Sequence, residues 1–155
     1  MLTNTFTPTI NAGFYRYDTC PQNAYIPDVD MSRDGPPKIL IVEDEAILAM
    51  CLQDKLVDLG YGLPPAVGSG EQAVQTALEY RPDLVLMDIK LNGKIDGLEA
   101  ARQIHEFCET PVIFMSAYSD IDTLQRALLA GPAGYLVKPV RLETLGKVIQ
   151  QALQA

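Results

Sequence analysis

Short, continuously apolar runs recur along the chain from Lys38 onward. Such runs, rich in β-branched residues, are typical of strands that are buried on both faces of a sheet. One further segment has strand-like composition but contains Pro64 and Pro65, which cannot donate ladder hydrogen bonds, so we expect it at a sheet edge. The predicted strands cover residues 38–42, 63–67, 83–88, 111–116 and 134–138.

Between these runs the apolar residues recur at helical spacing. Gly60 is typical of a helix end, and the stretch from Ser69 to Gln72 resembles a capping box. The predicted helices cover residues 46–59, 69–80, 97–108, 120–130 and 142–154. Regular alternation of strand and helix predicts an α/β domain with one parallel sheet and helices on both of its faces.

The first 37 residues lack this regularity. Threonine, asparagine and proline punctuate the segment, so we expect residues 1–37 to be a mostly disordered N-terminal extension before a domain at 38–155. Met31 offers an alternative start of translation. A docking role stays open because the segment carries isolated aromatic residues: Phe6, Phe14, Tyr15, Tyr17 and Tyr25.

Composition narrows the function classes. The formal net charge of −8 disfavours direct nucleic-acid binding, and it fits either plain solubility or an acidic, metal-binding cleft. Three scattered cysteines without a CxxC pair, and a single histidine, His105, argue against a zinc site or a histidine-based triad. No apolar run approaches the roughly 20 residues of a membrane span, and no signal peptide is evident, so we expect a cytoplasmic protein.

Polar residues follow the predicted strands where each ends. Glu43 and Asp44 follow the first strand, Asp88 ends the third, Ser116 the fourth and Lys138 the fifth. Parallel strands bring their carboxyl ends to one sheet edge, where ligands of such folds bind. Three carboxylates at one place repel one another unless a cation compensates, and an all-oxygen set suits Mg²⁺.

Each residue alone has a plainer interpretation. An acidic pair after a strand often only faces a helix N-terminus, and an aspartate or serine at a strand end often caps a turn. Lys138 alone is most simply a surface charge, and Tyr135 most simply a core residue. Their joint occurrence at the ends of successive strands favours a functional site over coincidence.

Lys38 to Ala155 resembles the receiver domain of two-component response regulators. Each stretch that carries the resemblance is modestly specific, but the ordered set is highly specific. The stretches are 39–45 (ILIVEDE), 83–88 (DLVLMD), 96–100 (DGLEA), 111–117 (PVIFMSA) and 134–139 (GYLVKP).

The resemblance implies a flavodoxin-like fold, with five parallel strands in the order 2-1-3-4-5 and five helices. It implies that Asp88 is the phosphoacceptor and that Ser116 and Lys138 contact the phosphoryl oxygens. It further implies that Tyr135 is a rotamer switch coupled to Ser116, and that the Lys138–Pro139 bond is cis. The Mg²⁺ ligands implied are Glu43, Asp44, Asp88 and the backbone carbonyl of Lys90.

The same resemblance implies partners. A sensor histidine kinase or histidine phosphotransfer protein would supply the phosphoryl group. We expect a stand-alone domain that catalyses only its own phosphorylation and dephosphorylation, and signals to a downstream protein. A homodimer dependent on phosphorylation is also open, whereas direct contact with nucleic acid or membrane is not expected.

The sequence departs from the commonest family pattern at three places. Glu43 stands where aspartate is more usual, Val140 replaces a frequent phenylalanine, and the segment 91–97 is one residue longer. The main alternative is a receiver-like binding module that works without phosphorylation. An aspartate-dependent phosphatase is disfavoured because Lys90 occupies the place of its second aspartate, and a nucleotide-binding domain because no glycine-rich phosphate loop follows the first strand.

Overall fold

A parallel sheet forms the centre of the molecule, whose computed structural model describes residues 34–117 and 121–154. The strands are β1 (Ile39–Val42), β2 (Leu84–Asp88), β3 (Val112–Ala117) and β4 (Gly134–Lys138), in the order β1-β2-β3-β4. The helices are α1 (Ala46–Asp58), α2 (Gly70–Tyr80), α3 (Gly97–Phe107), α4 (Ile121–Leu129) and α5 (Leu142–Gln154). The predicted α/β architecture with helices on both faces is confirmed.

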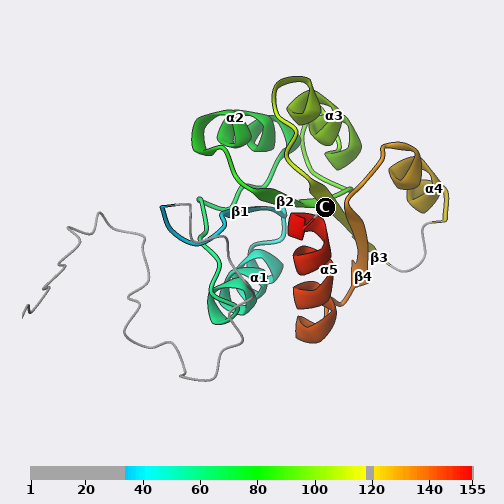
Figure 1. The fold of residues 1–155 in the computed structure, drawn as a ribbon. Coiled ribbons are helices and arrows are strands. Elements are labelled where there is room, and N and C mark those ends of the chain that lie inside the picture. The colour runs from blue at the N-terminus through cyan, green and yellow to red at the C-terminus, as the bar shows by residue number, and fades with distance from the viewer. Residues whose placement is uncertain (1–33, 118–120, 155) are drawn as a thin grey trace, which may run out of the picture.

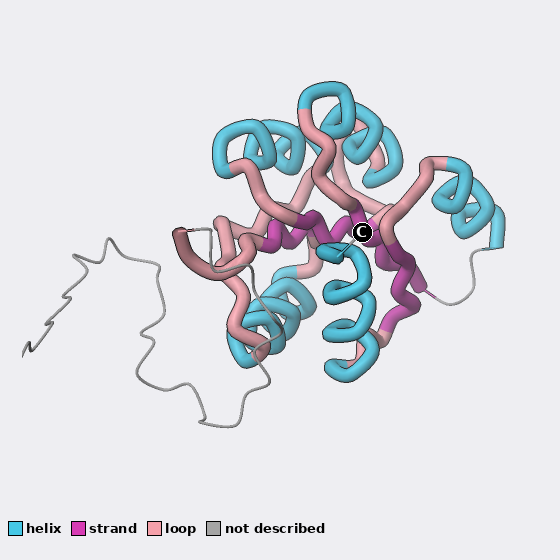
Figure 2. Tube along the Cα trace, in the orientation of Figure 1, coloured by secondary structure: helices cyan, strands magenta, loops and turns pink. Residues whose placement is uncertain are grey.

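Alternating side chains of each strand enter opposite cores. Leu40 and Val42 of β1 pack with α2, α3 and α4, whereas Ile39 and Ile41 pack with α1 and α5. Figures 1 and 2 show the two helical layers with the strands between them. Every residue of β1 and β2 is buried, as their uninterrupted apolar runs predict. At roughly 1.5–3 kcal/mol for each large apolar side chain, this double burial is the main source of stability.

The segment 63–67 is not a strand, which corrects the prediction of five strands in the order 2-1-3-4-5. The segment does follow the open edge of β1, through isolated parallel bridges from Lys38 to Gly62 and from Val42 to Val67. Backbone hydrogen bonds of 2.9–3.0 Å join Gly62, just before the segment, and Val67, at its end, to the chain in and beside β1. Pro64 and Pro65 lie between these bridges, and since neither has an N–H, no continuous ladder forms.

Helix termini agree closely with the predicted caps. Ser69 Oγ accepts a hydrogen bond from the Gln72 amide, as a capping box requires. The Gln72 side-chain oxygen, however, accepts from the amide of Gly68, one residue before the cap, and not from the amide of Ser69. The first helix ends at Asp58, one residue before the predicted end. The predicted extension up to residue 33 and the predicted helix start at Asp120 lie outside the described residues.

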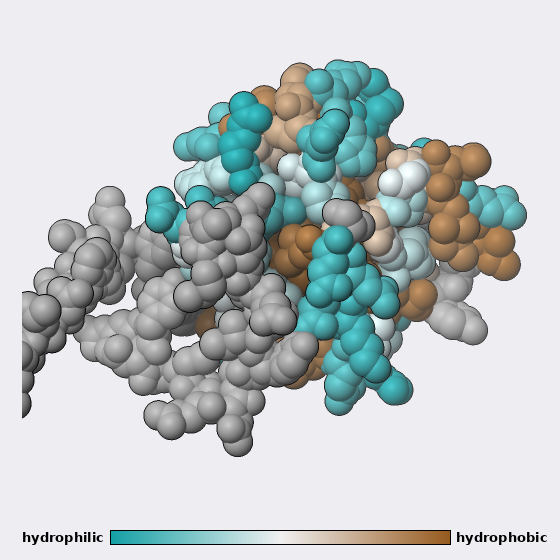
Figure 3. Space-filling model, viewed as in Figure 1, coloured by the Kyte–Doolittle hydropathy of each residue, from teal (hydrophilic) through white to brown (hydrophobic). Residues whose placement is uncertain are grey.

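Apolar side chains are exposed mainly on α4 in the view of Figure 3. Ile121, Leu128 and Leu129 of this helix are between 59% and 89% exposed. Among the helices that the structure describes, none combines the length and apolar character that a membrane crossing requires.

Candidate functional site

Register brings the predicted site residues to the same edge of the sheet. Val42 pairs with Met87, so Glu43 follows β1 beside Asp88 at the end of β2. Asp88 pairs in turn with Met115, the residue before Ser116. Ala117 pairs with Lys138 on the outer strand. All of these positions therefore lie at the carboxyl ends of the strands, as expected.

Lys138 links the carboxylate of Glu43, which follows β1, to that of Asp88, which ends β2. Its Nζ lies 2.5 Å from Glu43 Oε2 and 2.8 Å from Asp88 Oδ2. The Glu43 and Asp88 side chains are almost fully buried, and that of Lys138 is 21% exposed. The Lys138–Pro139 bond is cis, as the resemblance implied.

Burial and charge shift the proton affinities of this group. Burial raises the pKa of Glu43 above its ordinary value, despite the opposing hydrogen bonds from Lys138 and the Glu45 amide. Burial also opposes the charge of Lys138, but its hydrogen bonds to Asp88 and Glu43 outweigh that effect and raise its pKa. Lys138 therefore stays cationic, and it faces more negative charge than it balances.

The acidic residues are arranged to hold a cation. Carboxylate oxygens of Glu43, Asp44 and Asp88 all lie within 4.8 Å of one another, with Asp44 at the exposed side. An all-oxygen donor set with excess negative charge, open to water on one side, fits a hard ion that keeps several waters, such as Mg²⁺. These residues therefore fit the predicted metal.

The loop after β2 supports this cluster through its backbone. The Lys90 amide donates to Asp88 Oδ1, and the Asn92 amide donates to Asp44 Oδ2, each at 3.2 Å. A role of the Lys90 carbonyl as a ligand stays a prediction. The hydrogen bond from Asn92 was not predicted, because any residue type offers the same backbone amide and the sequence therefore does not mark the position.

Gly97 lets the next helix begin directly against the site. A Cβ at Gly97 would lie only 2.0 Å from the Asp88 carbonyl oxygen, so only glycine fits there. The Gly97 amide donates to the Ile89 carbonyl, and the Asp96 side chain caps α3 by accepting from the Glu99 amide. The close approach of Gly97 to the Asp88 carbonyl therefore packs the start of α3 directly against the backbone of Asp88.

Ser116 and Tyr135 are joined by a hydrogen bond. The Tyr135 hydroxyl donates to Ser116 Oγ at 2.7 Å, and Ser116 Oγ donates to the Ala117 carbonyl at 3.0 Å. Tyr135 also packs against the core on the α2–α4 side of the sheet. A change in the position of Ser116 would therefore reach Tyr135 directly.

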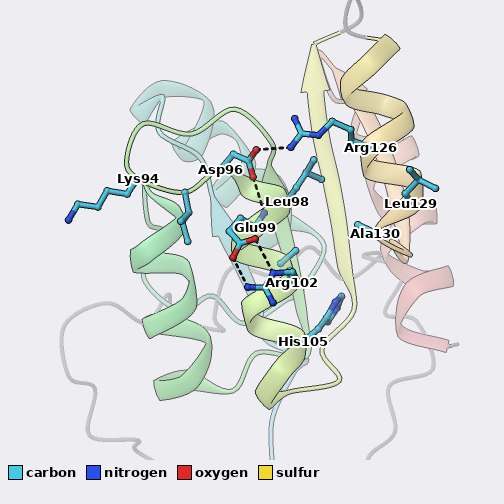
Figure 4. Close-up of a pocket in the computed structure, with 11 residues that line it drawn as sticks. Lys94, Asp96, Leu98, Glu99, Arg102, His105, Arg126, Leu129 and Ala130 are labelled. Carbon is cyan, nitrogen blue, oxygen red and sulfur yellow. Dashed lines mark hydrogen bonds and ion pairs between the residues drawn. The ribbon is translucent and has the colours of Figure 1, made fainter.

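A separate open groove of about 690 Å³ lies between α3 and α4 (Figure 4). Its lining carries both signs of charge, with Arg126 bonded to Asp96 and Arg102 bonded to Glu99. Glu43, Asp44 and Asp88 do not line it, so the groove is distinct from the carboxylate cluster.

Curated relatives are similar over most of the chain. The transcriptional regulatory protein PdtaR of Mycobacterium tuberculosis is 37% identical over 127 residues, which are 82% of this chain and 62% of PdtaR. The phyllosphere-induced regulator PhyR of Methylorubrum extorquens is 34% identical, over 80% of this chain and 46% of PhyR. The chain thus spans less than two thirds of the length of each of these relatives.

Solved structures share the fold. The signal receiver domain of a modulated diguanylate cyclase from Desulfovibrio desulfuricans is 41% identical, with a TM-score of 0.72 over 78% of this chain and 95% of that one. The receiver domain of the sensor histidine kinase PA1611 from Pseudomonas aeruginosa has a magnesium ion coordinated in its active-site cleft. It is 32% identical, with a TM-score of 0.70 over 79% of this chain and 100% of that one.

The response regulator receiver domain model matches residues 39–150. That range contains every predicted site residue and every buried residue of the two cores except Ala152. The fold, the acidic cluster and the relatives agree, and the chain belongs to the response regulator receiver family.

Proposed function

We propose that this chain is a phosphorylation switch in which Asp88 accepts a phosphoryl group from a phosphohistidine in a Mg²⁺-dependent reaction. The observation that carries the proposal is the joint contact of Lys138 with Glu43 and Asp88 beside Asp44. Such a cluster combines a nucleophilic carboxylate, a fixed cation and a cation-binding acidic set.

The proposed transfer is an in-line displacement at phosphorus. An oxygen of the Asp88 carboxylate forms the new P–O bond while the P–N bond to the donor histidine breaks, and the released imidazole nitrogen keeps the electron pair and takes up a proton. Bound Mg²⁺ supplies charge neutralisation at the phosphoryl oxygens. Lys138 adds a positive charge that already lies at the Asp88 carboxylate.

Switching would follow from the new charge. An aspartyl phosphate places strong acceptor oxygens at the sheet edge, so Ser116 Oγ would leave the Ala117 carbonyl and donate to one of them. Tyr135, bonded to Ser116, would change its packing with it. The population then shifts between two packings of α4, β4 and α5, and a downstream protein binds one of them.

On this proposal the chain has no catalytic activity beyond its own phosphorylation and dephosphorylation, and it acts in the cytoplasm. Its partners are the phosphoryl donor and the downstream protein, without direct contact to nucleic acid. The charge of the chain supports the absence of nucleic-acid contact, because the sequence has 20 acidic and only 12 basic residues.

The test is intact-mass measurement after incubation with acetyl phosphate, with Mg²⁺ or with a chelator. We expect one added phosphoryl group in the wild type with Mg²⁺, and none in Asp88→Asn. Asp83→Asn is the matched control, because Asp83 precedes the same strand at its other end, where it accepts a hydrogen bond from the Lys38 amide. Absence of the adduct in the folded wild type, both with acetyl phosphate and with the partner kinase, would favour the phosphate-independent binding module.

A further inference from the structure

Glu71 connects the start of α2 to the loop that follows β2. Its Oε1 accepts hydrogen bonds from the Lys94 amide at 2.6 Å and from the Ile95 amide at 3.2 Å. The residues are more than twenty positions apart, so this contact is tertiary. Glu71 is otherwise exposed to solvent, and it touches none of Glu43, Asp44 and Asp88 in the contacts of the described residues.

Two glycines allow the loop and the start of α2 to pack closely around Glu71. Gly93 has a φ of +137°, and a Cβ there would lie 2.7 Å from Glu71 Oε2. A Cβ at Gly70 would lie 2.6 Å from Ile95 Cγ1 and 2.9 Å from the Ile95 carbonyl oxygen. Both glycines therefore allow the loop and the first turn of α2 to approach closely around the Glu71 carboxylate.

Hydrogen bonds from backbone amides keep this carboxylate ionised. Its own amide, then that of Lys94, and more weakly that of Ile95, hold the pKa of Glu71 below its ordinary value. A charged acceptor makes a stronger hydrogen bond than a neutral one, which suits a residue that fixes backbone.

The same loop reaches the acidic cluster at its other end. Its Lys90 amide bonds Asp88, and its Asn92 amide bonds Asp44. Lys94 follows Asn92 by only two positions. The loop is therefore held between the candidate metal site and Glu71.

We propose that Glu71 is a positioning residue for the metal site, which it supports by fixing the loop whose backbone holds Asp44 and Asp88. This inference rests on the proposed function. It deepens that function by assigning part of the site's metal affinity to a residue on α2 that contacts the loop at the Lys94 and Ile95 amides. Groups that hydrogen-bond the metal ligands themselves commonly change metal affinity by about 10–100-fold, and Glu71 acts one contact further out, through the loop.

The first measurement is Mg²⁺ binding by calorimetry to the full chain, without any phosphoryl donor. We expect Glu71→Ala to weaken Mg²⁺ binding by about tenfold, the lower end of that range. Glu71→Gln keeps an oxygen acceptor without the charge, so it should restore much of the affinity. Glu79→Ala is the control, because it removes the same charge from an exposed position on the same helix and should change nothing.

Amide hydrogen exchange of the metal-free protein gives an independent readout. Glu71→Ala should speed exchange at Lys94 and Ile95 directly, and at Asn92 through the loop, while the strand amides of β2 and β3 keep their protection. Faster exchange at Lys94 and Ile95 with unchanged Mg²⁺ affinity would mean that the contact is only local, and would overturn the inference. Equal weakening by Glu71→Ala and Glu79→Ala would overturn it too, since general charge would then explain both.

These outcomes separate the inference from the proposed function. A wild type that binds Mg²⁺ and is phosphorylated, beside a Glu71→Ala variant with the same Mg²⁺ affinity, refutes only the role of Glu71. A wild type that binds no Mg²⁺ refutes both.

Discussion

The Lys138 ammonium lies 2.8 Å from the Asp88 carboxylate, although the two residues are 50 positions apart in the chain. The same ammonium donates to Glu43, so one cation holds together two carboxylates at the ends of neighbouring strands. In the metal-free protein it is the direct positive partner of both buried acids among the described residues. Much of the behaviour of the site follows from this arrangement.

Replacing Lys138 by methionine should destabilise the metal-free protein. Two buried carboxylates would face each other without their cation, and we expect a loss of about 1–3 kcal/mol, less than for a fully buried pair because Lys138 is partly exposed. Urea unfolding in the presence of a chelator measures this. Lys147→Met, at an exposed position of α5, should be nearly neutral. Equal losses in both variants would contradict the bridging role.

Mg²⁺ should stabilise the folded wild type. At a hundredfold excess over its dissociation constant, a ligand that binds only the folded state adds about 2.7 kcal/mol. Asp44→Asn removes one carboxylate from the cluster and should lose most of this gain, whereas Asp54→Asn on the exposed face of α1 should keep it. The measurement is the unfolding midpoint with and without Mg²⁺, and an unchanged gain in Asp44→Asn would argue against the site.

Gly97→Ala should be strongly destabilising. The added Cβ would collide with the backbone oxygen of Asp88, which cannot rotate away, so we expect a cost of about 3 kcal/mol or more. Gly146→Ala in α5 is the contrast, because a Cβ there would meet only Leu59 at 3.8 Å. Gly146→Ala should raise the free energy of unfolding by about 0.5–1 kcal/mol, because alanine has the higher helix propensity. Denaturant unfolding of both variants checks the opposite signs.

Tyr135→Phe should separate phosphoryl uptake from switching. It removes one hydrogen bond to Ser116, worth about 0.5–1.5 kcal/mol, and leaves Asp88, Lys138 and the acidic cluster in place. We expect the rate of phosphorylation by acetyl phosphate to stay close to wild type. Tyr80→Phe, at a partly exposed position on α2, controls for loss of a hydroxyl. A large loss of phosphorylation rate in Tyr135→Phe alone would give this hydroxyl a direct part in the transfer.

Glu99 should show an acid-shifted titration. Hydrogen bonds from Arg102, then from Gln103, lower its pKa from 4.5 to about 2. Because the folded value is depressed, its stabilising contribution is present above pH 4.5 and is lost as the pH falls toward 2. Carboxyl NMR should find the low midpoint in the wild type and a value nearer 4.5 in Arg102→Met. Since the pair is exposed, high salt should reduce the shift.

The layered fold follows from the residue pattern alone. Buried strands without alternation and helices with one apolar face leave few arrangements other than a covered parallel sheet, and residues 39–42 and 84–88 lie in it as predicted. Because parallel strands share one carboxyl end, the same pattern also placed Asp88, Ser116 and Lys138 together.

Contacts made by the backbone or between distant surfaces became visible only in the folded molecule. The edge segment 63–67 is held by isolated bridges, since strand pairing depends on which amides are present and not on apolar pattern alone. No residue pattern in the sequence indicates the hydrogen bond from the Asn92 amide to Asp44 or the one from the Lys94 amide to Glu71. A loop conformation that sets such contacts is fixed by packing against elements far away in the chain, which local residue preferences do not encode.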